Sequence, residues 1–158
     1  MFASCGDEAA GAVVGVFSGV QNDDDDWARS IQSIAQSDAA ASRNDKPHVC
    51  VLVLQPNTPL PPPIWRKRMA DANKALVAKR YHFAVVCPNP IHRGVLTAIL
   101  WLTGSRGGHH YTASSTFGEA AGWIRAETGE SYPTLESLCE RAHAQLADPP
   151  SRVRSQTS

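Results

Sequence analysis

The sequence lacks several features that would point directly to a function. Its 15 Lys and Arg residues balance 15 Asp and Glu residues, so no net charge attracts nucleic acid or an anionic membrane. No apolar stretch approaches the roughly 18 residues that a transmembrane helix needs. The N-terminal region contains Asp7 and Glu8 but no basic segment before its apolar run, which is not the pattern of a secretory signal. These absences predict a cytoplasmic protein with no membrane span and no nucleic-acid partner.

Metal-binding and redox motifs are missing as well. The chain has four widely spaced cysteines and no Cys-x-x-Cys pair: Cys5, Cys50, Cys87 and Cys139. In a chain of this length we expect them to be reduced and mostly buried. His109 and His110 are neighbours, and in a strand they would point to opposite faces of the sheet. We therefore expect no bound metal and no cofactor.

What the sequence does contain is an alternation of strand and helix signals. Short apolar, β-branched runs predict five strands, the last of them weak and near an edge: Phe2–Cys5, Gly11–Val20, Val49–Leu54, Phe83–Cys87 and His109–Ser114. Apolar residues at helical spacing predict helices that begin within Asp23–Asp26 and at Trp65, Ile91, Thr116 and Thr134. The second helix is expected to run to Arg80, and the fourth to end at Gly129.

The segments between these elements set the fold class. Ala39–Lys46 is small and polar and predicts a loop, while the prolines of Gln55–Pro63 exclude a helix or a central strand. The alternation predicts an α/β fold with a four- or five-stranded, mostly parallel sheet packed with four to five helices. We expect a single domain over residues 1–148 and a disordered tail over residues 149–158.

One motif suggests an enzyme. Cys87 and Arg93 stand at the Cys-x5-Arg spacing of a phosphatase loop, between a strand and a helix start that could hold an anion. Pro88 and Pro90 remove two of the backbone amides that a phosphate would need, and Gly94 stands where such loops place a hydroxyl. These departures favour a buried strand cysteine and a capping or ion-paired arginine. Anion binding without catalysis is a further alternative.

A basic helix face is the second candidate site. The helix that begins at Trp65 would carry six basic residues against one acid, Asp71: Arg66, Lys67, Arg68, Lys74, Lys79 and Arg80. This face is either solvated or docks an acidic partner, which includes the Asp23–Asp26 region of another copy. The tryptophans are expected to pack in the core from apolar helix faces: Trp27, Trp65, Trp101 and Trp123.

Two segments suggest a family. The order of elements, with Asn-Pro-Ile-His-Arg-Gly-Val-Leu-Thr-Ala at residues 89–98 and Phe-Gly-Glu-Ala-Ala-Gly-Trp-Ile at residues 117–124, resembles STAS-like proteins, the relatives of bacterial anti-sigma-factor antagonists. The resemblance covers Phe2 to Ile124 and implies a small, non-catalytic, protein-binding regulatory module. Signalling members carry a phosphorylated Ser or Thr beside an Asp. The matching turn here, Gln55–Pro59, has no Asp-Ser pair, and Thr58 is its one candidate phosphosite.

These observations lead to one prediction and two alternatives. The predicted function is a protein-binding module, with a homo-oligomer as an open possibility, whose recognition surface combines two groups of residues: Asn89, His92, Arg93 and Gly94, and Arg66, Lys67 and Arg68. The first alternative is a phosphatase or reductase that uses Cys87 and Arg93. The second is a carrier of a small apolar or lipid-like ligand, which predicts an apolar cavity.

Overall fold

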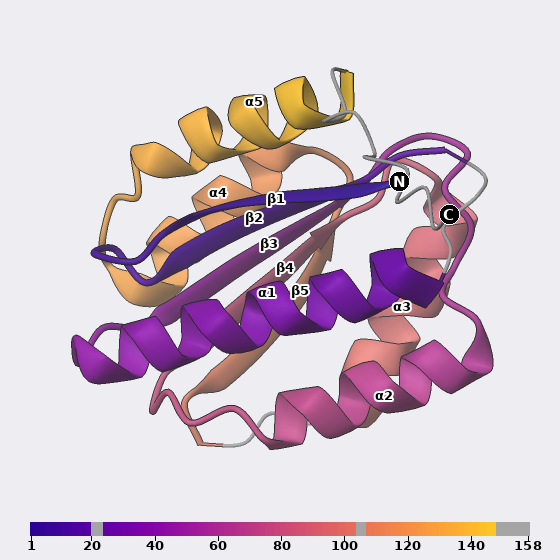
Figure 1. Cartoon of the computed structure of the whole chain (residues 1–158). Coiled ribbons are helices and arrows are strands. Elements are labelled where there is room, and N and C mark those ends of the chain that lie inside the picture. Colours follow the sequence, from indigo (N-terminus) through magenta and orange to yellow (C-terminus); the bar gives the residue numbers. More distant parts are fainter. Residues whose placement is uncertain (20–23, 104–106, 148–158) are drawn as a thin grey trace, which may run out of the picture.

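The computed structural model describes residues 1–19, 24–103 and 107–147. These residues form five strands and five helices around one sheet (Figure 1). In chain order they are β1 (Phe2–Asp7), β2 (Ala12–Phe17), α1 (Asp24–Arg43), β3 (His48–Leu54), α2 (Pro63–Lys74), β4 (Tyr81–Val86), α3 (Pro90–Thr103), β5 (His109–Ser114), α4 (Phe117–Thr128) and α5 (Thr134–Ala147). Asp23 and the predicted tail over residues 149–158 lie outside the described residues.

The strands follow one another in the sheet in the order β1-β2-β3-β4-β5. The hairpin strand β1 is antiparallel to β2, and β2 to β5 are parallel to one another. Every residue of β3 and β4 is buried, as expected for central strands that are covered on both faces. The α/β prediction with a mostly parallel sheet is therefore confirmed, and β5 lies at one edge of the sheet as expected.

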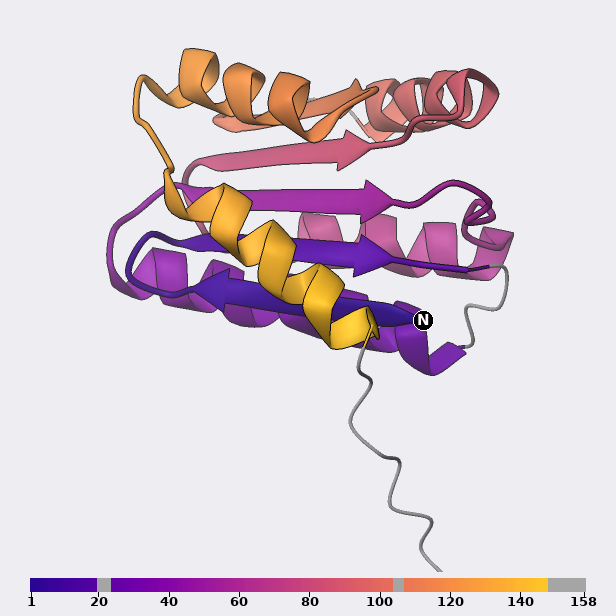
Figure 2. The same cartoon turned by 90° about the horizontal axis from the view of Figure 1, so that it is seen from above.

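Alternating side chains of the sheet point into two separate cores. On one face, Val51 packs in a cluster with Ile124 of α4 and Leu138 of α5. On the other face, Leu52 packs in a cluster with Trp27 of α1, and α2 and α3 lie on this side as well. Figure 2 shows α5 running across β1 and β2, while α4 packs over β4 and β5. Three helices, α1, α2 and α3, thus cover one face of the sheet, and two helices, α4 and α5, cover the other.

Two predicted element boundaries are wrong by more than three residues. A smaller error concerns Gln55–Pro63, where no helix was expected: α2 begins at Pro63, because proline is tolerated in the first turn of a helix. The segment Ala39–Lys46 is not all loop, because α1 continues to Arg43 and buries Ala40 and Ala41, two residues of high helix propensity. The second helix does not reach Arg80. It ends at Lys74, and the carboxylate of Asp38 then accepts hydrogen bonds from the next backbone segment. The last two basic residues of the predicted helix face therefore lie outside α2.

The tryptophans divide between the core and the surface. Trp27 and Trp65 are buried as predicted, and Trp123 packs against the first core. Trp101 is 84% exposed, so its predicted core position is wrong. The reason is its place on α3: the helix turns its Leu96 side to the sheet, and Trp101 lies about 140° around the helix axis from that residue. None of the described side chains of α3 is fully buried.

Candidate functional site

In the turn from Cys87 to Arg93, side chains of the turn form hydrogen bonds with its own backbone. The guanidinium of Arg93 donates hydrogen bonds to the carbonyl oxygens of Cys87 at 2.9 Å and Pro88 at 3.3 Å. The side chain of Asn89 caps α3, since its Oδ1 accepts hydrogen bonds from the amides of Ile91 at 2.9 Å and of His92 at 3.2 Å. The carbonyls of Cys87 and Pro88, just after β4, and the amides of Ile91 and His92 in α3 are thus already paired. Arg93 binds backbone carbonyls of the turn, while Asn89 is the residue that caps α3.

The Cys87 thiol is in the wrong environment for a nucleophile. It is 2% exposed, and its sulfur lies 3.6 Å from the carbonyl oxygen of Asn89. Burial raises the pKa of Cys87 by more than the Asn89 contact and the nearby Arg93 charge lower it, which keeps the thiol protonated. These contacts give Cys87 and Arg93 a structural role and lend no support to the phosphatase alternative.

Thr58 also has a structural role. Its side chain is buried, and its hydroxyl donates a hydrogen bond to the carbonyl oxygen of Phe17 at 3.2 Å. This contact joins the turn after β3 to the end of β2. A kinase would have to open the turn to reach the hydroxyl, so the geometry does not favour Thr58 as a phosphosite.

The basic residues of α2 point in different directions. Lys67 pairs with Asp71 at 2.9 Å on the exposed side of the helix, and the guanidinium of Arg68 lies 4.5 Å from the ring centre of Trp65. Arg66 is on another side of α2 and lines a pocket. Among the described residues, no hydrogen bond or ion pair joins α2 to the turn at Arg93. In the described residues, the two predicted groups are therefore not joined by hydrogen bonds or ion pairs, and Arg66 is the one of them that lines the pocket.

The Asp-rich start of α1 packs against α2 within the same chain. Asp24, Asp25 and Asp26 form the first turn of α1, where carboxylates interact favourably with the helix dipole. The Oδ1 of Asp24 accepts a hydrogen bond from the indole nitrogen of Trp65 at 2.6 Å. This acidic segment thus helps to position α2.

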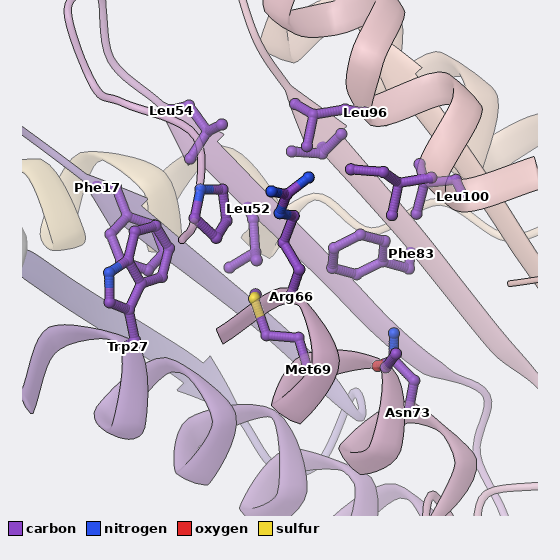
Figure 3. Close-up of a pocket in the computed structure, with 14 residues that line it drawn as sticks. Phe17, Trp27, Leu52, Leu54, Arg66, Met69, Asn73, Phe83, Leu96 and Leu100 are labelled. Carbon is purple, nitrogen blue, oxygen red and sulfur yellow. The ribbon is translucent and has the colours of Figure 1, made fainter. Parts of the chain in front are cut away.

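An apolar pocket lies between α2, α3 and the sheet, toward the carboxyl ends of the central strands (Figure 3). Its volume is about 90 Å³. Side chains from the sheet, α1, the proline-rich connection, α2 and α3 line it: Phe17, Leu52, Leu54, Phe83, Val85, Trp27, Pro61, Arg66, Met69, Ala70, Asn73, Leu96, Ile99 and Leu100. Ligand sites in open α/β sheets commonly lie outside the carboxyl ends of parallel strands.

Helical periodicity explains which residues reach this pocket. On α2, Arg66, Met69 and Asn73 recur at spacings of three and four residues, so they share one face of the helix. On α3, Leu96 and Leu100 share a face in the same way, and His92 lies one turn earlier on that face. The polar side-chain groups among the residues lining the pocket are the carboxamide of Asn73, the indole N–H of Trp27 and the guanidinium of Arg66, and only Arg66 is charged.

A buried polar contact holds the chain just after α2. The carboxylate of Asp38 accepts hydrogen bonds from the amides of Val77 at 2.7 Å and Ala78 at 3.1 Å. Its Oδ1 also lies 3.4 Å from the Nδ1 of His48, a close electrostatic contact without the alignment of a hydrogen bond. We call Asp38 and His48, with these two amides, the Asp38 clamp.

The clamp places an ionised carboxylate beside a neutral imidazole. Burial raises the pKa of Asp38, but the His48 contact and the two amides outweigh it, so this pKa lies below its ordinary value. Burial lowers the pKa of His48 by more than Asp38 raises it. Asp38 therefore stays charged, and His48 stays neutral, at neutral pH.

His109 and His110 point to opposite faces of the sheet, as the strand pattern predicts. His109 Nε2 lies 3.1 Å from the carbonyl oxygen of Ala78, whereas His110 pairs with Glu127 of α4 at 3.2 Å on the other face of the sheet. In the part of the chain that the structure describes, no three His, Cys, Asp or Glu side chains are grouped so as to hold a metal ion. Within the same residues, no helix has the length and apolar character to cross a membrane.

Sequence reasoning identified Arg66 but missed the pocket beside it. The apolar residues at Met69, Leu96 and Leu100 were expected to fill the core, because a helical stripe has the same pattern whether it packs fully or borders a hollow. The one available signal was α3 itself, which has apolar residues all round and therefore predicts a further covering element.

Comparison with known proteins supplies no assignment. No protein family, curated protein or solved structure matches this chain. The resemblance to STAS-like proteins stays a prediction, and the functional argument depends on the pocket between α2 and α3.

Proposed function

We propose that this chain is a non-catalytic, STAS-like module that binds a protein partner in a regulatory role. The binding site is the pocket between α2 and α3, together with the exposed surface of α3 beside it. The partner inserts one apolar side chain, the anchor, into the pocket. The single observation that carries this proposal is an apolar pocket that opens beside a helix with large exposed apolar side chains.

The exposed side of α3 supports the docking of a macromolecule. Ile91 is 76% exposed and Val95 is 38% exposed, and they lie one turn apart on the helix. Val95 in turn lies one turn from Ile99, which lines the pocket. A continuous apolar stripe therefore runs from the pocket along α3, and contiguous exposed apolar surface of this kind is typical of interaction sites.

The size of the pocket favours a protein partner over a lipid-like ligand. Sites for small molecules and cofactors usually enclose about 300–1,000 Å³. A cavity of about 150 Å³ holds benzene, so the pocket volume of about 90 Å³ corresponds to one aliphatic side chain, or to an aromatic side chain whose ring stays partly at the open mouth. The apolar lining favours the carrier alternative, but the volume is too small for a lipid chain and fits the anchor residue of a protein interface.

The proposal is tested by filling the pocket. Ala70 of α2 lines the pocket, so the variant Ala70→Phe should occupy it with a benzyl group. The matched control is Ala126→Phe, the same change at an exposed position of α4 on the opposite side of the sheet. The parent and both variants are used as bait in affinity capture from the native host, after urea unfolding has verified that all three are folded.

We expect a protein that the parent and Ala126→Phe capture equally and that Ala70→Phe loses at least tenfold, because the anchor can no longer enter. A partner retained equally by all three baits would show that the pocket is not the binding site. Capture of no specific partner by the parent would count against a binding module of any kind.

A further inference from the structure

The Arg66 side chain is a charged group that faces an apolar pocket. In Figure 3 it points from α2 into the space between Leu52 and Leu96. Among the described residues, no hydrogen bond or ion pair involves its guanidinium, and none of the residues lining the pocket is an Asp or Glu. A guanidinium offers five N–H donors in a planar fork that matches the two oxygens of a carboxylate.

Three carboxylates of the neighbouring elements have other partners, and Asp25 is exposed at the start of α1. Asp24 accepts the hydrogen bond of Trp65, and Asp26 forms an ion pair with Arg29. On α2 itself, Asp71 lies on the far side of the helix, where it pairs with Lys67. Arg66 thus differs from the other cations of its helix: Lys67 has an acid beside it, and Arg68 lies over the Trp65 ring.

We propose that the pocket between α2 and α3 recognises an apolar anchor that carries a carboxylate a few atoms away. This inference rests on the proposed protein-binding function and names the chemistry of the partner segment. The apolar group fills the hollow above Phe83 and Leu96, and the carboxylate binds the guanidinium of Arg66 at the mouth. A partner presents these groups as a Phe, Leu or Met side chain next to an Asp, a Glu or its own terminal carboxylate.

Two properties of the site determine this chemistry. The lining can accept only an apolar body, because a polar group placed among Leu52, Phe83 and Leu100 would lose its hydrogen bonds to water without replacement. The carboxylate, in contrast, meets a cation at the solvent-exposed rim, where a charge-assisted pair forms with little desolvation. A cationic or neutral polar group next to the anchor would leave Arg66 without compensation.

A matched pair of small probes tests the inference directly. 3-Phenylpropionate carries a phenyl group and a carboxylate separated by two methylene groups, and 3-phenylpropanol replaces the carboxylate by a neutral hydroxymethyl group. Each probe is titrated into the ¹⁵N-labelled full chain, and two-dimensional NMR follows the backbone amide signals. The same titrations are made with Arg66→Gln and with the control Lys74→Gln, which removes an exposed cation of α2 that does not line the pocket.

We expect the acid to bind with a dissociation constant on the order of 1–10 mM, as befits a ligand of this size, and to shift amides of Met69 and Leu96. The acid should bind about fivefold more tightly than the alcohol. Arg66→Gln should abolish that preference and leave alcohol binding unchanged, whereas Lys74→Gln should preserve it.

If 3-phenylpropionate and 3-phenylpropanol bind the parent equally, the proposed role of the carboxylate is wrong. That result would not contradict the apolar anchor or the proposed function. A preference that persists in Arg66→Gln would overturn the assignment to Arg66. If neither probe shifts α2 and α3, the inference about this pocket is wrong, and capture with Ala70→Phe separately decides whether a protein partner docks there.

Discussion

The Asp38 clamp predicts a large and specific loss of stability in the variant Asp38→Asn. The carboxylate is 3% exposed and accepts two amide hydrogen bonds, from Val77 and Ala78. Asparagine has a similar size, but its single carbonyl oxygen can accept one of these bonds well, and its NH2 group then faces the other amide. Each hydrogen bond to a charged group contributes about 1.5–3 kcal/mol, so we expect a loss of about 2–4 kcal/mol in the free energy of unfolding.

Urea unfolding at neutral pH, followed by tryptophan fluorescence and circular dichroism, measures this loss. The midpoint should fall with no change in the slope, since the variant does not change the surface exposed on unfolding. The control is Asp71→Asn, which removes an exposed carboxylate of α2 and should leave the midpoint unchanged within error. A loss below about 1 kcal/mol for Asp38→Asn would refute the reasoning that the clamp is a buried, charged acceptor.

Three further predictions concern pH, packing and thiol chemistry. Burial lowers the pKa of His48, so the unfolded chain binds more protons than the folded protein at mildly acidic pH. The free energy of unfolding should therefore fall as the pH drops below about 6.5. If the variant His48→Gln shows a pH slope of the same size, another group causes the pH dependence. The variant Gly15→Val should lower the free energy of unfolding in urea by about 1–3 kcal/mol, because an added Cβ would lie 2.8 Å from side-chain atoms of both Leu52 and Phe2. An unchanged urea midpoint would show that these two side chains move aside. In the native protein, Cys87 should react with a thiol reagent at least tenfold more slowly than in urea, because the buried thiol stays protonated; equal rates would mean that it is accessible.

Much of the fold could be predicted from the sequence because many elements begin, end or pack through residues that are close together in the chain. Thr116 caps α4 by accepting a hydrogen bond from the Glu119 amide at 3.2 Å, and Gly129 ends the helix with a left-handed φ of 70°. The buried strands β3 and β4 were similarly visible as continuous apolar runs. Each of these signals depends on residues within a few positions of one another.

The misplaced end of α1 was a local error, since Ala40 and Ala41 have high helix propensity. The other errors occurred where distant residues decide the outcome. Asp38 of α1 meets Val77 and Ala78 after α2, and no periodicity in either segment indicates that contact. The exposure of Trp101 depends on which side of α3 faces β5. The candidate site shows the same contrast. The charge of Arg66 could be predicted from the sequence, but the pocket beside it depends on how α2 is placed relative to α3 over the sheet.

The central claim is that a protein partner docks on α2 and α3 over the apolar pocket. The most direct measurement is two-dimensional NMR of the ¹⁵N-labelled chain with the captured partner added, because it maps the contact surface residue by residue. The account predicts that the amides of Arg66, Met69, Leu96 and Leu100 shift or broaden first. Shifts confined to α4 and α5, on the opposite face of the sheet, would contradict it.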